Sequence, residues 1–251
     1  MGQVLFLGQM NREDVARVAS AAIAIVPLGA TEQHGPHLPL LTDTIIVEGI
    51  SRRALDLLET ESDIVVTPTL PMGSSHHHLF ACALSFSTDT YIGVLRDICV
   101  SLIRSGFRRI FFVNGHGGND LAMRMVCNEL VLAADVTIAA CSYWTLTPVA
   151  PGGPDNAIDH AGRYETSIML HLAPDLVGKP ASETGKTAAF FDAVLSQGLL
   201  INRHGEWSRI GGVTMPPHDA SADLGARIVA DRAAALAEAI RRFDEASRNQ
   251  Q

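Results

Sequence analysis

The order of strand-like and helix-like segments most constrains the fold of this 251-residue chain. Short apolar runs alternate with longer stretches whose apolar residues recur every three or four positions, a spacing typical of amphipathic helices. The apolar runs predict strands at residues 22–28, 64–66, 109–113 and 136–142. The helical spacing predicts helices at residues 11–20, 44–61, 88–105, 119–134, 162–173 and 223–245. Repeated strand–helix units of this length predict a mainly parallel sheet with helices on both faces.

Length and charge exclude several classes of protein. The chain is long enough for one α/β domain or two small ones, and we expect a single domain over residues 1–251. A net charge of −8 without any basic run argues against nucleic acid or an anionic membrane as a partner. The sequence contains neither a long apolar run nor a signal peptide, so we expect a cytoplasmic protein. The cysteines lack metal-binding spacing, and we expect buried free thiols at Cys82, Cys99, Cys127 and Cys141.

The strand at residues 22–28 ends in a polar loop that carries the first candidate ligands. Because side chains alternate in direction along an extended segment, Glu32 and His34 project to the same side and can reach one metal ion or one substrate atom. Asp43 stands at the start of the next helical segment, which would hold it rigidly. The alternative is a surface loop with incidental charges. A glycine and two prolines stiffen this loop, which favours a site.

A glycine-rich loop, residues 114–119, follows the next long strand. Glycines between a strand and a helix can cradle phosphate, but Asp120 stands where the dinucleotide pattern needs its third glycine, and no G-x-x-x-x-G-K-[ST] motif occurs. What remains is His116, at a position where glycines allow a tight turn and a close ligand. Although a lone loop histidine is commonly a surface residue, this one joins polar groups from other strand ends, where ligands bind in parallel sheets.

Residues 159–167 supply a third polar set. Asp159 and His160 precede a predicted helix, and Glu165 falls in its first turns. The alternative is that these carboxylates only favour the positive end of the helix, which contributes roughly 0.3–1 kcal/mol. Imidazoles and carboxylates without a thiolate suit zinc, manganese or iron, and also two adjacent ions. The candidate metal ligands are Glu32, His34, Asp43, His116 and Glu165.

At these residues the chain resembles the creatininase family, the creatinine amidohydrolases and their relatives. Five motifs carry the resemblance over nearly the whole length: Glu-x-His-Gly-x-His-Leu-Pro with a following Thr-Asp, Gly-x-Ser-x-x-His, Asn-Gly-His-Gly-Gly-Asn, His-Ala-Gly-x-x-Glu-Thr-Ser and Gly-Val-x-x-x-Pro. The resemblance implies an α/β/α sandwich of parallel strands and two divalent metal ions, zinc ahead of manganese or iron. It also implies a homo-oligomer, a hexamer built as a trimer of dimers.

Metal-binding roles follow from the resemblance. Glu32 and His116 are similar to ligands of one metal, His34 to a ligand of the other, and Asp43 to the carboxylate that bridges both. In creatininase itself the histidine is followed by Tyr-Glu, and that Glu binds metal. This chain has Gly117 and Gly118 there, so the resemblance assigns the missing position to Glu165 or to water and argues against creatinine as the substrate.

Substrate-side roles follow in the same way. His160 matches a catalytic histidine, and Trp144 matches a tryptophan that shapes the substrate pocket. We also expect substrate contacts from Ser75, His78 and Asp159. The three consecutive histidines at residues 76–78 lie in the substrate-side loop, although an ordinary polar loop would also account for them.

The predicted activity is hydrolysis of a C–N bond in a cyclic amide or formamide-type small molecule. Two cations about 3.5–4 Å apart, bridged by Asp43 and a water, would lower the pKa of that water toward neutrality. His160 would pass a proton to the departing nitrogen, with its ring oriented by Asp159 or a backbone carbonyl, and Glu165 is a second catalytic candidate. The alternatives are opening of a cyclic ketone of the inosose type, cleavage of a peptide bond, or a non-catalytic ligand-binding relative.

Overall fold

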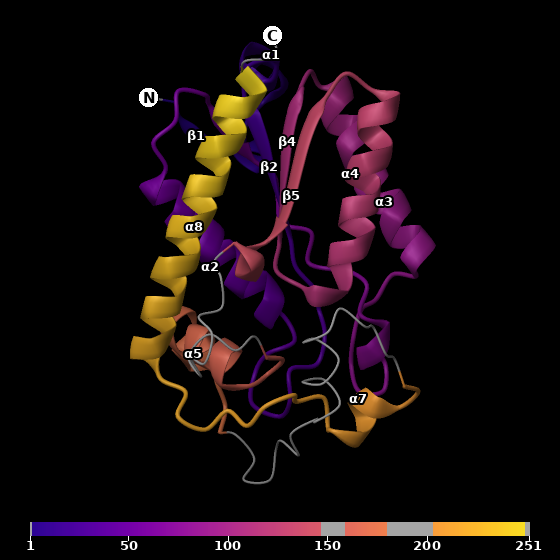
Figure 1. Cartoon of the computed structure of the whole chain (residues 1–251), viewed down its shortest axis with the longest axis vertical. Helices are drawn as coiled ribbons and strands as arrows, with labels where there is room; N and C mark the ends of the chain where they lie inside the picture. The colour runs from indigo at the N-terminus through magenta and orange to yellow at the C-terminus, as the bar shows by residue number, and fades with distance from the viewer. Residues whose placement is uncertain (1, 147–158, 180–202, 249–251) are drawn as a thin grey trace.

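The computed structural model describes residues 2–146, 159–179 and 203–248, and it has an α/β fold with a five-stranded sheet. The strands are β1 (Val4–Phe6), β2 (Ile23–Leu28), β3 (Ile64–Val66), β4 (Arg109–Asn114) and β5 (Thr137–Ser142). Their order is β1-β3-β2-β4-β5, and each neighbouring pair is parallel. Helices lie on both sides of the sheet (Figure 1), which confirms the predicted fold class.

The helices are α1 (Arg12–Val18), α2 (Thr42–Leu57), α3 (Thr88–Arg104), α4 (Asp120–Ala133), α5 (Arg163–Leu172), α7 (Glu206–Arg209) and α8 (Ala222–Arg248). Short 3-10 turns include η2 (His76–His78) and η3 (Gly117–Asn119). Each predicted helix is present with ends shifted by a few residues. Ser87 caps α3, because its hydroxyl accepts the N–H of Thr90.

Alternating side chains of the central strands build two hydrophobic cores. Ile23 and Ile25 of β2 face the layer of α2, α5 and α8, whereas Ala24 and Val26 face the layer of α3 and α4. Because both faces of β2 and β4 are covered, these strands are buried throughout, and their residues are apolar except for Arg109 and Asn114 at the two ends of β4. The long helix α8 belongs to the first layer, where the ring of Phe243 packs edge-on against Phe111 of β4 at a centroid distance of 5.4 Å.

Two expectations need correction. Strand β1 was not predicted, because three residues at the sheet edge give no alternating pattern and Val4 and Phe6 stay exposed. The expectation of buried thiols is wrong for Cys82, which is exposed in the loop after η2, and Cys127 is only partly buried. Cys99 and Cys141 are buried, and their burial raises the thiol pKa to about 12. The proline- and glycine-rich stretch at residues 147–159, for which the sequence predicts a loop, lies outside the described residues except for Asp159.

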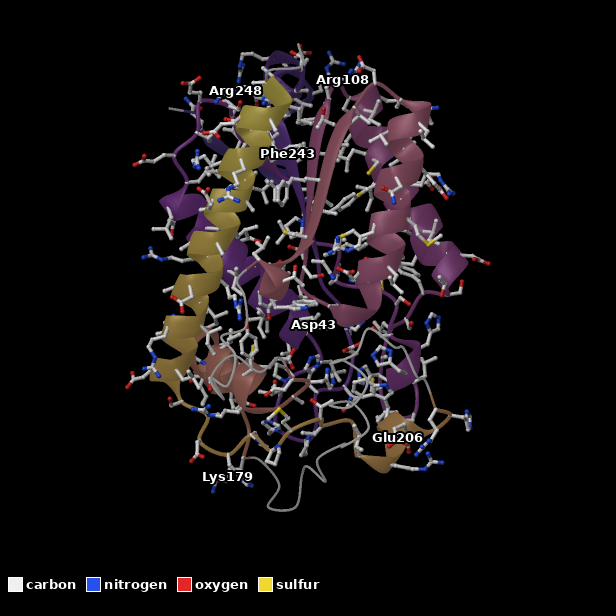
Figure 2. All side chains as sticks on the ribbon, viewed as in Figure 1. Asp43, Arg108, Lys179, Glu206, Phe243 and Arg248 are labelled. Carbon is white, nitrogen blue, oxygen red and sulfur yellow. The ribbon has the colours of Figure 1, made fainter. Side chains whose placement is uncertain are left out.

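The carboxyl ends of the strands meet at one end of the molecule, and the polar loops after β2, β3 and β4 lie there. Figure 2 shows Asp43 toward this end and Arg248 at the opposite end of the sheet. Asn119 joins the three loops, since its side chain donates to the carbonyl of Gly29 (3.0 Å) and accepts the N–H of Ser74 (3.0 Å), and its amide also contacts Asn114 (3.2 Å). In the described part of the chain no helix has the length and apolarity needed to cross a membrane.

Candidate metal centre

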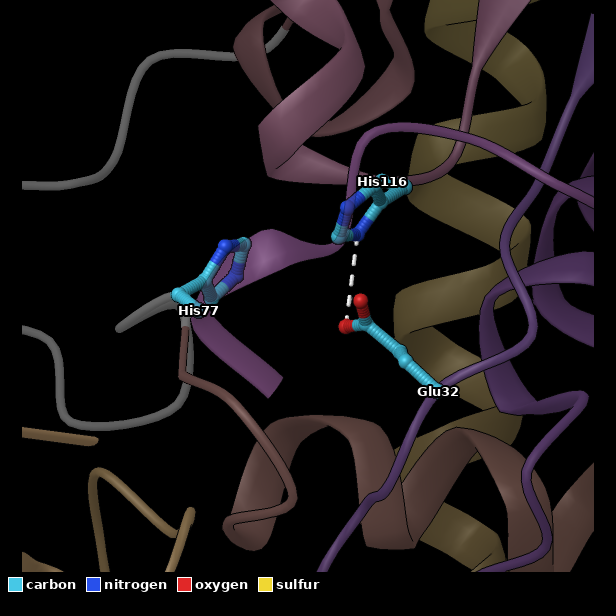
Figure 3. A group of neighbouring side chains, drawn as sticks. All are labelled: Glu32, His77 and His116. Carbon is cyan, nitrogen blue, oxygen red and sulfur yellow. Dashed lines mark ion pairs between the residues drawn. The ribbon is translucent and has the colours of Figure 1, made fainter. Parts of the chain in front are cut away.

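Side chains from two loops and one helix converge at the carboxyl end of the sheet. Glu32 and His34 follow β2, Asp43 lies in the first turn of α2, and His116 follows β4; all four are buried. His116 Nδ1 lies 3.1 Å from Asp43 Oδ2. The same nitrogen lies 3.3 Å from Glu32 Oε1, an ion pair that Figure 3 shows as a dashed line. His34 Nε2 lies 3.3 Å from Asp43 Oδ1. The two oxygens of Asp43 therefore face different imidazoles, an arrangement that suits a carboxylate shared by two ions.

Backbone carbonyls fix the orientation of both imidazoles. His116 Nε2 lies 3.0 Å from the carbonyl of Ser74, and His34 Nδ1 lies 3.1 Å from the carbonyl of Glu32. Because a carbonyl oxygen can only accept, each of these nitrogens donates, and the other ring nitrogen faces the carboxylates. Metal-binding histidines commonly hold their second N–H in this way.

The facing atoms have no hydrogen-bond partners of their own. Both carboxylate oxygens of Glu32, Oδ2 of Asp43 and Nε2 of His34 are buried and form no hydrogen bond within the described residues. Buried polar atoms without partners cost about 1–3 kcal/mol each, and more when they are charged. Divalent cations would remove this cost, so the residues present fit a metal centre.

Glu165 completes a second group of candidate ligands. It lies in the first turn of α5, and its Oε2 lies 3.5 Å from His34 Nε2 and accepts the N–H of Ala161 at 2.7 Å. Ligand atoms of His34, Asp43 and Glu165 lie within 4.8 Å of one another. Gly118 has no side chain that could supply this ligand. A larger residue would not fit there, because its Cβ would lie 2.0 Å from the carbonyl oxygen of Ser74.

The carboxylates change the protonation of the histidines. Burial acts to lower the pKa of His34, but the charges of Asp43 and Glu165 raise it to about 10. Burial also acts to lower the pKa of His116, but Glu32 and Asp43 raise it to about 9. Without metal, both rings are therefore positively charged at neutral pH, with a hydrogen on each ring nitrogen. Metal ligation requires deprotonated imidazole, so metal binding would release protons.

His77 joins Glu32 and His116 in another group whose ligand atoms lie within 4.8 Å of one another (Figure 3). Its half-buried ring stacks on the His116 ring at 5.9 Å, and burial together with the charge of His78 lowers its pKa to about 3. The ring is therefore neutral and able to ligate. The sequence did not single it out, because nothing in three consecutive histidines tells which one turns inward.

Ser75 and His78, both expected near the substrate, lie beside the candidate ligands. Ser75 Oγ is 3.3 Å from His116 Nε2, and His78 Nε2 is 3.3 Å from Glu32 Oε1. Trp144 packs edge-on against Tyr143, with ring centroids 5.1 Å apart.

Another tryptophan, Trp207 of α7, lies against the histidines. Its ring centroid is 4.8 Å from that of His77, 4.7 Å from that of His78 and 5.4 Å from that of His160. This position of Trp207 was not predicted from the sequence, because no motif or periodicity in this region indicates where α7 packs.

His160 borders the cluster, and a backbone carbonyl orients it. Its Nε2 lies 3.0 Å from the carbonyl of Gln33, and its Nδ1 lies 3.7 Å from Glu32 Oε1. Burial and the neighbouring His34 and His78 hold the pKa of His160 well below its usual range, so the ring is neutral. Asp159 does not contribute to this orientation through a hydrogen bond, because its oxygens accept the backbone N–H groups that begin α5 (2.8 and 3.3 Å).

The chain is similar to several known proteins over most of its length. The family model Creatininase (creatinine amidohydrolase) matches residues 8–240. The mycofactocin precursor peptide peptidase of Mycobacterium ulcerans (strain Agy99) is 32% identical over 242 residues, 91% of this chain and 89% of the relative. The creatinine amidohydrolase of Pseudomonas putida is 32% identical over 205 residues, 70% of this chain and 75% of the relative. A mutant creatininase of the Zn-Zn type has a similar structure, with a TM-score of 0.74, 25% identity, and coverage of 96% of this chain and 98% of that one.

Proposed function

The chain belongs to the creatininase family of hydrolases, and we propose that its polar cluster binds divalent metal ions and hydrolyses a carbon–nitrogen bond of an amide. The observation that carries this proposal is the set of buried atoms without hydrogen-bond partners on Glu32, His34 and Asp43, which face one another across the cluster. In a surface loop with incidental charges, such atoms would be exposed and would form hydrogen bonds with water.

The candidate ligands divide between two positions. Glu32, His77 and His116 would hold one ion, and His34 and Glu165 would hold the other. Asp43 would contact both. Bound divalent cations lower the pKa of water toward neutrality and polarise a carbonyl group. We propose zinc for both positions, in line with the Zn-Zn type of the similar creatininase.

His160 is suited to the proton transfers that amide hydrolysis needs. An amine leaves poorly as an anion, so a residue must deliver a proton to the departing nitrogen. The neutral ring of His160 has Nδ1 directed toward Glu32, and its Nε2–H is held by the carbonyl of Gln33. It can therefore accept a proton at Nδ1 and pass it on without turning.

The substrate is either a small amide or a peptide. A cyclic amide or formamide-type molecule fits the site because Trp207 and the packed histidines leave it lined with rings. The peptide has support of its own, because the mycofactocin precursor peptide peptidase matches more of this chain than the creatinine amidohydrolase does. The absence of any side chain at Gly118 argues against creatinine itself.

Metal analysis of dialysed protein tests the proposal. We expect two metal equivalents in the wild type and in a His218→Ala control, whose residue is exposed, and a loss of at least one in His116→Ala. Activity screens should cover cyclic amides, formamides, inososes and short peptides. Full metal content with wild-type turnover in His116→Ala would contradict the proposal. The family resemblance also suggests a homohexamer, which light scattering would test. The cytoplasmic location expected from the sequence would be tested by cell fractionation.

A further inference from the structure

Gln33 has a buried side chain that contacts two histidines at the proposed site. Its Nε2 lies 2.7 Å from His78 Nδ1, 3.1 Å from His160 Nε2 and 3.1 Å from the carbonyl oxygen of Gly212. Its Oε1 accepts the backbone N–H of Gly35 at 2.9 Å. The role of this residue depends on which of these groups donate a hydrogen and which only accept one.

Two backbone groups fix which end of the amide is the donor. The N–H of Gly35 can only donate, so the side-chain atom that it meets is the oxygen. The carbonyl of Gly212 can only accept, so the atom that it meets is the nitrogen. A flipped amide would place two donors together at one end and two acceptors together at the other.

The backbone carbonyl of Gln33 then fixes the tautomer of His160. It lies 3.0 Å from His160 Nε2, which must therefore carry the hydrogen and leave the lone pair on Nδ1. Since that nitrogen donates, it is no acceptor for the Gln33 amide. The two amide hydrogens go to Gly212 and to Nδ1 of His78, so that His78 carries its own hydrogen on Nε2.

The two rings thus differ in the group that faces Glu32 Oε1: His78 presents a hydrogen-bond donor, and His160 presents an acceptor. His78 Nε2–H lies 3.3 Å from Glu32 Oε1, and the His160 Nδ1 lone pair lies 3.7 Å from the same oxygen. We infer that Gln33 is a positioning residue that makes His78 a hydrogen-bond donor and leaves His160 a proton acceptor at the site. This inference rests on the proposed function. An amide offers one acceptor and one donor, its carbonyl and its N–H, and is therefore complementary to this pair.

Gly212 is a glycine because of this contact. A Cβ at position 212 would lie 2.3–2.4 Å from the amide atoms of Gln33, so only glycine lets the carbonyl approach. Its φ is +71°, and the neighbouring Gly211 has a similar φ of +66° but nothing within 4 Å of its Cβ position. Thr214, two residues on, accepts the N–H of His160 at 2.7 Å. The Gly-Val-x-x-x-Pro motif thereby holds both Gln33 and His160.

Nitrogen NMR of histidine-labelled protein, recorded with and without added zinc, tests the inference, with signals assigned through His78→Gln and His160→Gln. In the wild type we expect both rings to carry hydrogen on Nε2 and none on Nδ1. In Gln33→Met, His78 should lose its fixed tautomer, whereas His160 should keep its own because the backbone carbonyl remains. A hydrogen on Nδ1 of either ring in the wild type, or an unchanged His78 in Gln33→Met, would overturn the inference.

A matched glycine pair gives an independent readout should Gln33→Met fail to fold. Gly212→Ala should change the His78 signal as Gln33→Met does, and Gly211→Ala, with the same backbone strain, should not. Equal effects of the two glycine variants would contradict the role of Gln33. The tautomers can be read without a substrate. A wild type that binds no metal and hydrolyses nothing would therefore refute the proposed function while the tautomers still decide this inference.

Discussion

Replacement of Asp244 should destabilise the protein strongly, although this residue lies at the end of the sheet opposite the candidate site. Its carboxylate is buried and accepts hydrogen bonds from Arg109 (2.9 Å), Ser62 (2.5 Å) and Thr60 (2.5 Å). Asp244→Ala leaves the Arg109 cation buried without its carboxylate. Removing one partner of a buried pair costs about 3–5 kcal/mol. For a chain of this size each kcal/mol lowers Tm by roughly 2–4 °C, so we expect a loss of about 6–20 °C.

Urea unfolding at pH 7 and one protein concentration measures the effect. The control is Asp231→Ala on the exposed side of the same helix, for which we expect a change within about 0.5 kcal/mol. A loss below about 1 kcal/mol in Asp244→Ala would refute the reasoning, since the buried pair would then contribute no more than an exposed one.

The same pair predicts a pH dependence. Burial alone would raise the pKa of Asp244, but hydrogen bonds from Ser62 and Thr60 and the charges of Arg248 and Arg109 lower it. A carboxyl with a lowered pKa stabilises the fold above its unfolded pKa, near 4, and loses this contribution as the pH falls through the folded value. The stability gap between the wild type and Asp244→Ala should therefore narrow below about pH 4.

Three further predictions concern the candidate site. Gly118→Ala should destabilise the protein by about 1–3 kcal/mol, because its Cβ would meet the carbonyl of Ser74, whereas Gly117→Ala has open space and should be tolerated; urea unfolding compares them. His77→Ala should weaken metal binding by about 10–100-fold in competition with a chromogenic chelator, and His76→Ala, at an exposed position, should not. Metal affinity should fall from pH 8 to pH 6, because the raised pKa values of His34 and His116 make protons compete with metal; an affinity independent of pH would contradict this.

The sequence predicted the fold well where burial gives a clear pattern. Strands β2 and β4 are covered on both faces and appear as continuous apolar runs, and α8 shows its amphipathic spacing over 27 residues. Strand β1 could not be predicted, because its pairing with β3 depends on tertiary contacts rather than on its own three residues.

Motifs at strand ends and in the first turns of two helices indicated which side chains would come together. Glu32, Asp43 and His116 come together as expected because parallel strands bring their carboxyl ends to one edge. His77 and Trp207 could not be predicted, since their positions depend on how a 3-10 turn and a short helix pack across the site.

Buried carboxylates at the two ends of the sheet distinguish a structural ion pair from a metal centre. At the amino end Asp244 has Arg109 as its cation, and both of its oxygens accept hydrogen bonds. At the carboxyl end Glu32 and Asp43 have ion pairs only with histidines within the described ranges. Nε2 of His34 has no hydrogen-bond partner in the described part of the chain, and its other nitrogen donates to a carbonyl. The carboxylates raise the pKa of His34 to about 10 and that of His116 to about 9, so without metal it is protons on these rings that balance the buried carboxylates. An imidazole can give up its proton to a metal ion, whereas the Arg109 guanidinium cannot be deprotonated, and this difference separates a site that can exchange protons for metal from a fixed ion pair.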